Sequence, residues 1–232
     1  HVNNEIGNLL DLDQVGELCQ AHGAFFHTDA VQGVGHFSFD LKSQPIDFLT
    51  AAAHKFHGPK GIGFAYIKKN SGMHSFIVGG PQERGLRAGT ESLHNIVGMQ
   101  KAIEIAYEKL EEERQFILDL KKYFIEKLKG LFPEVYFNGL SENLEKSTYT
   151  LVNVALPIDP SKAALLSFHM DLKGIACSKG SACQSGAAAG SHVLSVLHRP
   201  EDVKKLPSLR FSFSSFNTHA EVDYVIKTLS EF

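Results

Sequence analysis

One stretch limits what this chain can fold into: an apolar run, 47–53, is followed at once by His54, Lys55 and several glycines. The apolar run is typical of a buried strand, so Lys55 falls where that strand gives way to a loop. The glycines let the backbone turn and come close to a ligand. Most lysines that follow a strand are simply exposed, but one in this position can form a Schiff base with a carbonyl group.

A second apolar run, 24–28, ends at Asp29, and the interval to Lys55 leaves room for one crossover between parallel strands. Residues 11–22 carry apolar side chains at helical spacing, and Gly23 is a natural end for that helix. Alternating helices and strands predict a parallel sheet, whose ligands lie beyond the carboxyl ends of the strands. An acid and a lysine at that edge suit pyridoxal phosphate, which needs an acid for its ring nitrogen and a lysine for its aldehyde.

Six segments in a fixed order extend this interpretation to a resemblance. They are His1-Val-Asn-Asn4-Glu-Ile-Gly7, His27-Thr-Asp29-Ala-Val-Gln32, Ala53-His54-Lys55, Glu83-Arg-Gly-Leu-Arg-Ala-Gly-Thr90, Gly180-Ser-Ala-Cys183 and Leu209-Arg210-Phe-Ser. Together they resemble the cysteine desulfurases, which are class V, fold-type I pyridoxal phosphate enzymes. The resemblance implies that the chain begins in mid-protein. The part before it carries, in the family, the phosphate-binding loop and a histidine that stacks on the cofactor ring.

The resemblance implies an α/β fold: the C-terminal part of a fold-type I enzyme, with a partial, mostly parallel large-domain sheet and a small α+β domain. It assigns 1–108 to the remainder of the cofactor-binding domain and 109–232 to a small domain with the catalytic cysteine loop. The residues agree with a division there, because the helical spacing over 91–129 breaks near Lys109. Further strands are predicted at 61–67, 131–137, 149–155, 175–177 and 209–214, and helices at 161–172 and after a capping box at Thr218–Glu221.

The resemblance implies three catalytic residues, Lys55, His54 and Cys183. Lys55 would bind the cofactor covalently and abstract the α-proton of L-cysteine, and the Cys183 thiolate would take up the sulfur as a persulfide and release alanine. His54 would also contact the cofactor. The small residues around Cys183 cannot fill a core, so this thiol should be exposed, whereas Cys177 at a strand end should be buried. Without the resemblance, Cys183 has roughly even odds of a role.

The resemblance also implies the binding residues. Asp29 keeps the ring nitrogen protonated, and Asn4 and Gln32 contact the ring oxygen, with Asn4 also at the substrate. Thr90 contacts the cofactor phosphate of the partner subunit in a homodimer, and Arg210 binds the substrate carboxylate. Alternation over 209–214 places Arg210 on the polar face of a strand, where a guanidinium suits bidentate capture of a carboxylate. The plain alternative is an exposed strand arginine.

One position departs from the family, and two other functions stay open. Ala52 stands three residues before Lys55, where the family usually has a serine that forms a hydrogen bond to the cofactor phosphate. Loss of this hydrogen bond should cost about 1.5–3 kcal/mol of cofactor affinity. The first alternative function is a class V aminotransferase or selenocysteine lyase, which needs no persulfide on Cys183. The second is a truncated, non-catalytic fragment or binding subunit. For a desulfurase, the implied partner is an iron–sulfur scaffold or another sulfur acceptor.

Composition narrows the remaining classes. The 232 residues are 43% hydrophobic, enough for one large or two small cores. A formal net charge of −3 gives no support for nucleic-acid binding, and no apolar run reaches the length of a membrane span. Three cysteines without a CxxC pair favour a reducing compartment, the cytoplasm. Of the twelve histidines only His54 and His57 are close in sequence, so no metal site is predicted.

Overall fold

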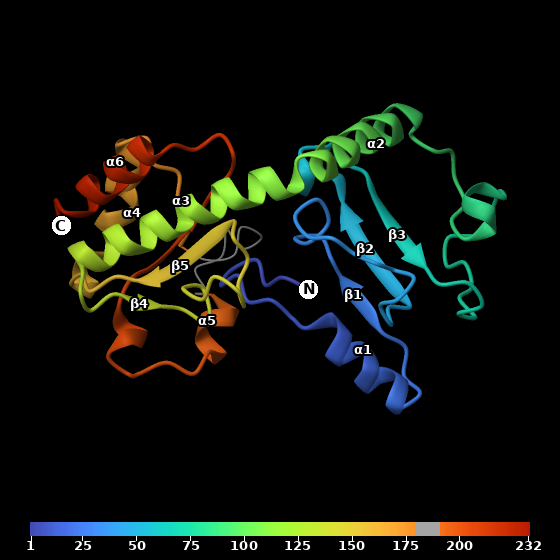
Figure 1. Ribbon diagram of the computed structural model, residues 1–232, viewed down its shortest axis with the longest axis horizontal. Helices are drawn as coiled ribbons and strands as arrows, with labels where there is room; N and C mark the ends of the chain where they lie inside the picture. The colour runs from blue at the N-terminus through green and yellow to red at the C-terminus, as the bar shows by residue number, and fades with distance from the viewer. Residues whose placement is uncertain (180–190) are drawn as a thin grey trace. The chain divides into compact units, whose positions relative to one another are not determined.

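The computed structural model describes residues 1–179 and 191–232, which form two compact units (Figure 1). Unit 1 comprises His1 and Leu10–Leu110, and unit 2 comprises Val2–Leu9 and Glu111–Phe232. The chain therefore passes between the units close to the predicted division at 108. The roles assigned to domains 1–108 and 109–232 stay a prediction.

The N-terminal segment Val2–Leu9 packs in unit 2, although the sequence analysis had placed it in the first domain. Backbone hydrogen bonds explain this position. The Thr148 amide donates to the Gly7 carbonyl at 2.8 Å, and the Leu9 amide donates to the Lys146 carbonyl at 3.0 Å. These bonds join residues far apart in sequence, which no local pattern reveals.

Unit 1 is built on a three-stranded sheet in the order β1–β2–β3. The strands are β1 (His27–Asp29), β2 (Phe48–Ala52) and β3 (Gly63–Ile67). β1 and β2 are parallel, as the alternating pattern predicted, and β3 runs antiparallel to β2. All three strands were expected, but each is shorter than its apolar run.

Two helices, α1 (Leu12–Ala21) and α2 (Leu93–Glu108), contribute to the core of unit 1. The Asp11 side chain caps α1 by accepting the Gln14 amide at 3.0 Å, and Gly23 follows the helix at φ 62°, which favours glycine. Cys19 on α1 is partly buried against the core. Leu18 is 61% exposed, so not every apolar side chain at helical spacing over 11–22 reaches the core.

Unit 2 is an α+β arrangement on a second three-stranded sheet, in the order β4–β5–β6 and antiparallel throughout. The strands are β4 (Tyr136–Phe137), β5 (Leu151–Ala155) and β6 (Ser208–Ser212). The helices are α3 (Leu110–Leu131), α4 (Ala163–Leu172), α5 (His192–Val196) and α6 (His219–Leu229). α3, α4 and α6 gather beside the sheet (Figure 1), where side chains such as Leu120, Met170 and Leu229 are fully buried.

Helix boundaries in unit 2 follow their sequence signals in part. Lys109 separates α2 from α3, which confirms the predicted break, and Thr218 and Glu221 form the predicted capping box of α6. The helix predicted at 161–172 is wrong at its start: α4 begins at Ala163, and Lys162 precedes it without a side-chain cap. Ser161 is not the cap, because it lies within a short 3-10 turn, Pro160–Lys162.

Two predicted strands differ from the structure. The run 131–137 yields only β4, because α3 continues through Leu131 and a turn, closed by the Val135 amide on the Phe132 carbonyl, takes up residues 132–135. Residues 175–177 form no strand; the extended pairing starts at Ser178, in an isolated bridge to Arg210. Among the described residues, no helix combines the length and apolar character needed to cross a membrane.

Candidate functional site

The carboxyl end of β1 places Asp29 at the edge of the unit 1 sheet. In the parallel pair, Asp29 lies opposite Thr50 of β2, so β2 continues toward Lys55 at the same edge. The Asp29 side chain is exposed and accepts a hydrogen bond from the Val31 amide at 2.9 Å. This bond shapes the turn after the strand and leaves the second carboxylate oxygen able to accept from a ligand.

Lys55 lies in a short 3-10 helix, Ala53–Phe56, that follows β2 directly. Ala53 and Phe56 are buried and anchor this helix in the core, whereas Lys55 is half-buried and His54 is exposed. The helix ends at His57, whose φ of 65° is uncommon for a residue with a side chain. The Lys55 backbone carbonyl lies 3.1 Å from His36 Nε2. The Lys55 side chain thus projects from a short helix whose backbone is held by the buried Ala53 and Phe56 and by the contact with His36.

A close approach behind this helix explains the Gly33-Val-Gly35 motif. Gly35 has a φ of 81°, and a Cβ there would lie 2.5 Å from the Phe56 Cβ. Only glycine lets the turn after Asp29 pack against the helix that carries Lys55. Gly35 therefore serves local packing.

The remaining unit 1 candidates occupy different surroundings. Gln32 is half-buried in the turn that follows Asp29, and Thr90 is exposed just before α2. Ala52, half-buried, ends β2 and pairs with Gly63 of β3, so it offers no hydroxyl where the family usually has one.

Arg210 is the centre of the candidate site in unit 2. It lies on β6 between the buried side chains of Leu209 and Phe211, and is itself half-buried on the other face. Its Nη1 donates to the Asn4 backbone carbonyl at 2.8 Å, and its Nη2 donates to Ser178 Oγ at 3.2 Å. Its Nε is buried and has no partner among the residues that the structure describes. The guanidinium is thus oriented by neutral acceptors and keeps its charge for an anion.

The two acceptors of Arg210 add contacts that the sequence did not predict. Asn4 contributes its backbone oxygen to Arg210, and the role predicted for its side chain stays a prediction. Ser178 was not identified as a site residue. It pairs with Arg210 by backbone bonds of 3.1 and 2.8 Å as well as through its hydroxyl. Apart from its place beside Cys177, no sequence signal marked Ser178, because the pairing joins two separate segments.

A buried amide fixes the segment that carries Asn4. The Asn153 side chain on β5 donates from Nδ2 to the Glu5 carbonyl at 2.9 Å. Asn153 is 2% exposed and Glu5 is 1% exposed, so this bond is shielded from water. The acceptor for Arg210 is therefore positioned by β5, the strand next to β6.

The cysteines are only partly covered by the structure. Cys183 lies outside the described residues, so its prediction rests on the sequence. Cys177 is a free thiol and half-buried rather than buried, and desolvation raises its pKa. A raised pKa reduces the thiolate fraction at neutral pH, and the thiolate is the reactive form.

Within each unit the structure brings together a distinct part of the predicted set. Unit 1 holds Asp29, Gln32, His54, Lys55 and Thr90, and unit 2 holds Asn4 and Arg210. The carboxylate and amine at the ends of β1 and β2 fit the ring nitrogen and aldehyde of pyridoxal phosphate, while Ala52 leaves one phosphate contact unmade. Among residues 1–179 and 191–232, no three His, Cys, Asp or Glu side chains cluster to hold a metal.

A lysine and an aspartate at the ends of neighbouring parallel strands are the arrangement expected of an α/β enzyme that uses pyridoxal phosphate. The aminotransferase class-V family matches residues 1–225, and the chain belongs to this family.

Within this family, the chain is similar in sequence to curated proteins named cysteine desulfurase. The chain is 40% identical over 227 residues to the cysteine desulfurase IscS of Clostridium botulinum, covering 98% of the chain and 56% of that relative. It is 37% identical over 229 residues to IscS of Dictyoglomus turgidum, covering 99% of the chain and 57% of the relative. The identities to these relatives confirm the resemblance to cysteine desulfurases. The chain spans a little over half the length of these curated relatives.

The fold of the chain is also similar to that of solved NifS-like structures. A NifS-like protein superposes with a TM-score of 0.83 at 32% identity, over 99% of this chain and 58% of that one. A NifS-like protein from Rickettsia africae gives 0.83 at 30% identity, over 99% and 59% respectively. The fold of the chain is therefore that of part of a NifS-like enzyme, as the sequence predicted.

Proposed function

We propose that this chain is the part of a cysteine desulfurase that removes sulfur from L-cysteine, releasing alanine and passing the sulfur on as a protein persulfide. The observation that carries the proposal is the placement of Asp29 and Lys55 at the ends of two parallel, paired strands. The similarity to relatives named cysteine desulfurase supports the choice of reaction.

In unit 1 the proposed residues bind the cofactor and hold or transfer protons. Pyridoxal phosphate, when bound, supplies an electron sink for the electrons of the α-carbon. The exposed Asp29 carboxylate would hold a proton at the ring nitrogen, and the Lys55 Nζ would hold the cofactor through its aldehyde and serve as the base for the α-proton. His54, exposed beside Lys55, and Gln32, in the turn after Asp29, contribute contacts to the cofactor. Thr90 contributes from the loop before α2, toward the phosphate of a second copy.

In unit 2 Arg210 orients the substrate by its carboxylate. The Asn4 carbonyl and Ser178 hydroxyl hold the guanidinium plane at 2.8 and 3.2 Å, so little side-chain entropy is lost when a carboxylate binds. The Asn4 side chain, half-buried next to this carbonyl, is proposed to contact both substrate and cofactor ring oxygen.

Cys183 is the proposed sulfur acceptor. Its thiolate attacks the substrate sulfur, a sulfur–sulfur bond forms, and the carbon–sulfur bond breaks with its electron pair left on carbon; protonation of that carbon gives alanine. Cys177 is not suited to this step, because burial raises its pKa and disfavours the thiolate.

The proposed setting follows from this chemistry. The persulfide would be delivered to an iron–sulfur scaffold or another sulfur acceptor, and the enzyme would work as a homodimer in the cytoplasm. The free state of Cys19 and Cys177 agrees with a reducing compartment. The alternatives are an aminotransferase or selenocysteine lyase, for which Arg210 would serve equally well, and a non-catalytic fragment.

Replacement of the two C-terminal cysteines tests the reaction. Cys183→Ser should keep the visible absorbance of the lysine-bound cofactor and lose persulfide formation, measured by trapping with a thiol-reactive label and mass spectrometry. Cys177→Ser is the matched control, only six residues away in the sequence, and should keep both. Alanine and sulfide release at the parental rate by Cys183→Ser would favour the lyase or aminotransferase, and lack of the absorbance band in the parent would favour the fragment.

A further inference from the structure

Unit 2 contains a buried cation, Arg199, with no counter-ion among the residues that the structure describes. Arg199 follows α5 in the chain. It is 8% exposed, and desolvation lowers the pKa of its guanidinium. Among residues 1–179 and 191–232, no carboxylate forms an ion pair with it, and segment 180–190 contains no aspartate or glutamate. A buried charge of this kind costs several kcal/mol unless an anion compensates it.

Neutral groups hold the guanidinium from behind. Arg199 Nη1 donates to Asn138 Oδ1 at 3.2 Å, and Nη2 donates to the Leu194 carbonyl at 3.1 Å. Asn138 is itself fully buried and fixed by Asn153 and Ser208, so the acceptor cannot swing away. The Arg199 Nε is buried and has no partner among the described residues. The network fixes the orientation of Arg199 but leaves its charge uncompensated.

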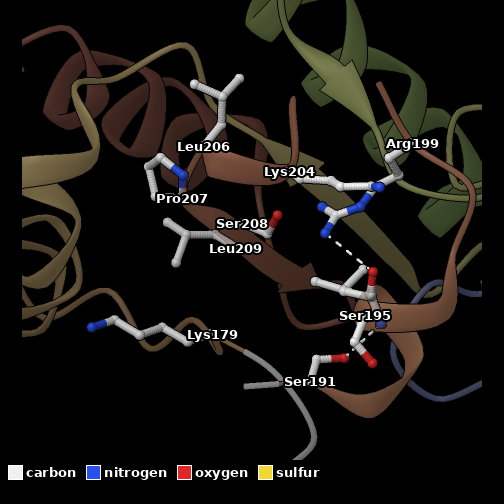
Figure 2. Close-up of a pocket in the computed structure, with 10 residues that line it drawn as sticks. Lys179, Ser191, Ser195, Arg199, Lys204, Leu206, Pro207, Ser208 and Leu209 are labelled. Carbon is white, nitrogen blue, oxygen red and sulfur yellow. Dashed lines mark hydrogen bonds between the residues drawn. The ribbon is translucent and has the colours of Figure 1, made fainter. Parts of the chain in front are cut away.

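Arg199 lines a cavity of about 500 Å³, within the size range of small-molecule sites. In Figure 2, Arg199 and Lys179 lie on opposite sides of this cavity, with Ser208 and Leu209 between them. Leu194, Leu206 and Pro207 add apolar wall, and Lys204 also lines the cavity. Ser191 and Ser195 lie at one end (Figure 2). The cavity therefore combines cations with hydrocarbon.

The other charges near the cavity do not neutralise Arg199. Lys204 is paired with Glu201 at 2.6 Å, which leaves that pair neutral. The buried Glu5 accepts a short hydrogen bond from Ser191; it does not line the cavity and forms no ion pair with Arg199. Lys179 is exposed at the rim and adds a second positive charge.

We propose that this cavity is a binding site for a small organic carboxylate with a branched or otherwise compact apolar tail and no amino group. The carboxylate pairs with Arg199, whose planar donors match it, and the tail packs against Leu194, Leu206 and Pro207. An ammonium group would meet Arg199 and Lys179, so amino acids are disfavoured. The apolar wall favours an organic acid over inorganic phosphate. The inference is independent of the proposed desulfurase activity.

A matched set of probes tests the site by calorimetry at low salt. Three share one skeleton: 4-methylpentanoate, its neutral amide, and L-leucine, which adds only an α-ammonium; inorganic phosphate is the fourth. All titrations use the Arg210→Gln background, so that Arg210 cannot bind the probes. We expect saturable binding of 4-methylpentanoate, at least about ten-fold weaker binding of the other three, and weakening as salt is raised.

Two variants connect the binding to the cavity. Arg199→Gln should weaken 4-methylpentanoate binding at least ten-fold, and Lys179→Gln, at the exposed rim, about two-fold; exposed Arg114→Gln on α3 is the control and should change nothing. If Arg199→Gln fails to fold, Lys179→Gln and the leucine comparison decide. Equal binding of acid, amide and leucine, or binding insensitive to both cavity variants, would overturn the proposal. Phosphate binding that alone depends on Arg199 would overturn the choice of an organic acid.

Discussion

The two units build their chemistry in opposite ways. In unit 1, Asp29, His54 and Lys55 come from two neighbouring strands and the helix that follows, close together in sequence. In unit 2, Arg210 is oriented by Asn4, which is 206 residues away, and by Ser178, which is 32 residues away. Unit 1 leaves its reactive side chains exposed or half-buried, whereas unit 2 buries polar and charged groups such as Asn153, Lys121 and Arg199.

This difference shows which part of a site tolerates a local change. A strand end needs only its own sheet to place a side chain, so the unit 1 residues depend on β1, β2 and the glycine turn. The unit 2 residues depend on shielded hydrogen bonds across distant segments, where removal of one partner leaves another unpaired. Substitutions in unit 1 should therefore affect chemistry alone, and those in unit 2 should also affect stability.

The largest expected effect lies in unit 1. Lys55→Ala should abolish covalent attachment of the cofactor, because the reactive amine is lost, while thermal stability stays nearly unchanged. Borohydride reduction followed by peptide mapping should place the pyridoxyl mass on Lys55 in the parent and nowhere in the variant. Lys60→Ala, an exposed lysine in the same loop, is the control and should retain the label. A label on Lys60 in the parent would remove Lys55 from the proposal.

A buried lysine sharpens the contrast in unit 2. Lys121 is 0% exposed, donates to Ser147 Oγ at 2.7 Å and the Thr148 carbonyl at 2.8 Å, and desolvation lowers its pKa to about 8 from 10.5. Between these two values the unfolded chain binds more protons than the folded one, so stability should rise with pH across this window. The expected gain is about 3 kcal/mol, present in full above pH 10.5 and absent below pH 8.

Denaturant unfolding at several pH values between 7.5 and 10.5 measures this gain. Lys121→Met should lose the pH-dependent rise, whereas Lys122→Met, the exposed neighbour, should keep it. Parallel curves for the parent and Lys121→Met would mean that Lys121 is charged in the folded protein at the same pH as in the unfolded chain.

Arg210 tests whether the unit 2 half of the site binds substrate. Arg210→Gln should raise the KM for L-cysteine about 10- to 100-fold, because a charge-assisted bond contributes about 1.5–3 kcal/mol. Its kcat should fall less. Ser178→Ala removes only one neutral bond to the guanidinium and should raise KM by a few-fold. A KM unchanged in Arg210→Gln would assign the carboxylate to another residue.

The smallest expected effect is at the end of β2. Ala52→Ser should tighten pyridoxal phosphate binding about ten-fold, the equivalent of one modest hydrogen bond to the phosphate. Equilibrium titration of the apo protein, followed by absorbance, gives the affinity. Ala65→Ser, on the exposed face of β3, is the control. Equal affinities in all three proteins would mean that a hydroxyl at position 52 has no phosphate within reach.

Local sequence signals were sufficient for most of the elements. Apolar runs located all three strands of unit 1, and Gly23 and Thr218 marked helix ends, because each signal depends on atoms a few residues away. The order of motifs also identified the family, which the match over 1–225 confirmed. Local patterns failed over 131–137: α3 includes Leu131 and a turn covers 132–135, so only Tyr136–Phe137 remain for β4.

By itself, then, the sequence determined the family, the parallel strand pair and the residues at its edge, since these are set by spacing along the chain. Only the tertiary structure decided that Val2–Leu9 joins unit 2, that Ser178 and the Asn4 carbonyl orient Arg210, and that Arg199 is buried with no carboxylate paired to it in the described part of the chain. Each of these depends on hydrogen bonds between segments distant in sequence. The bonded residues become neighbours only when the sheet of unit 2 forms, and the periodicity of the sequence does not predict which distant segments pair.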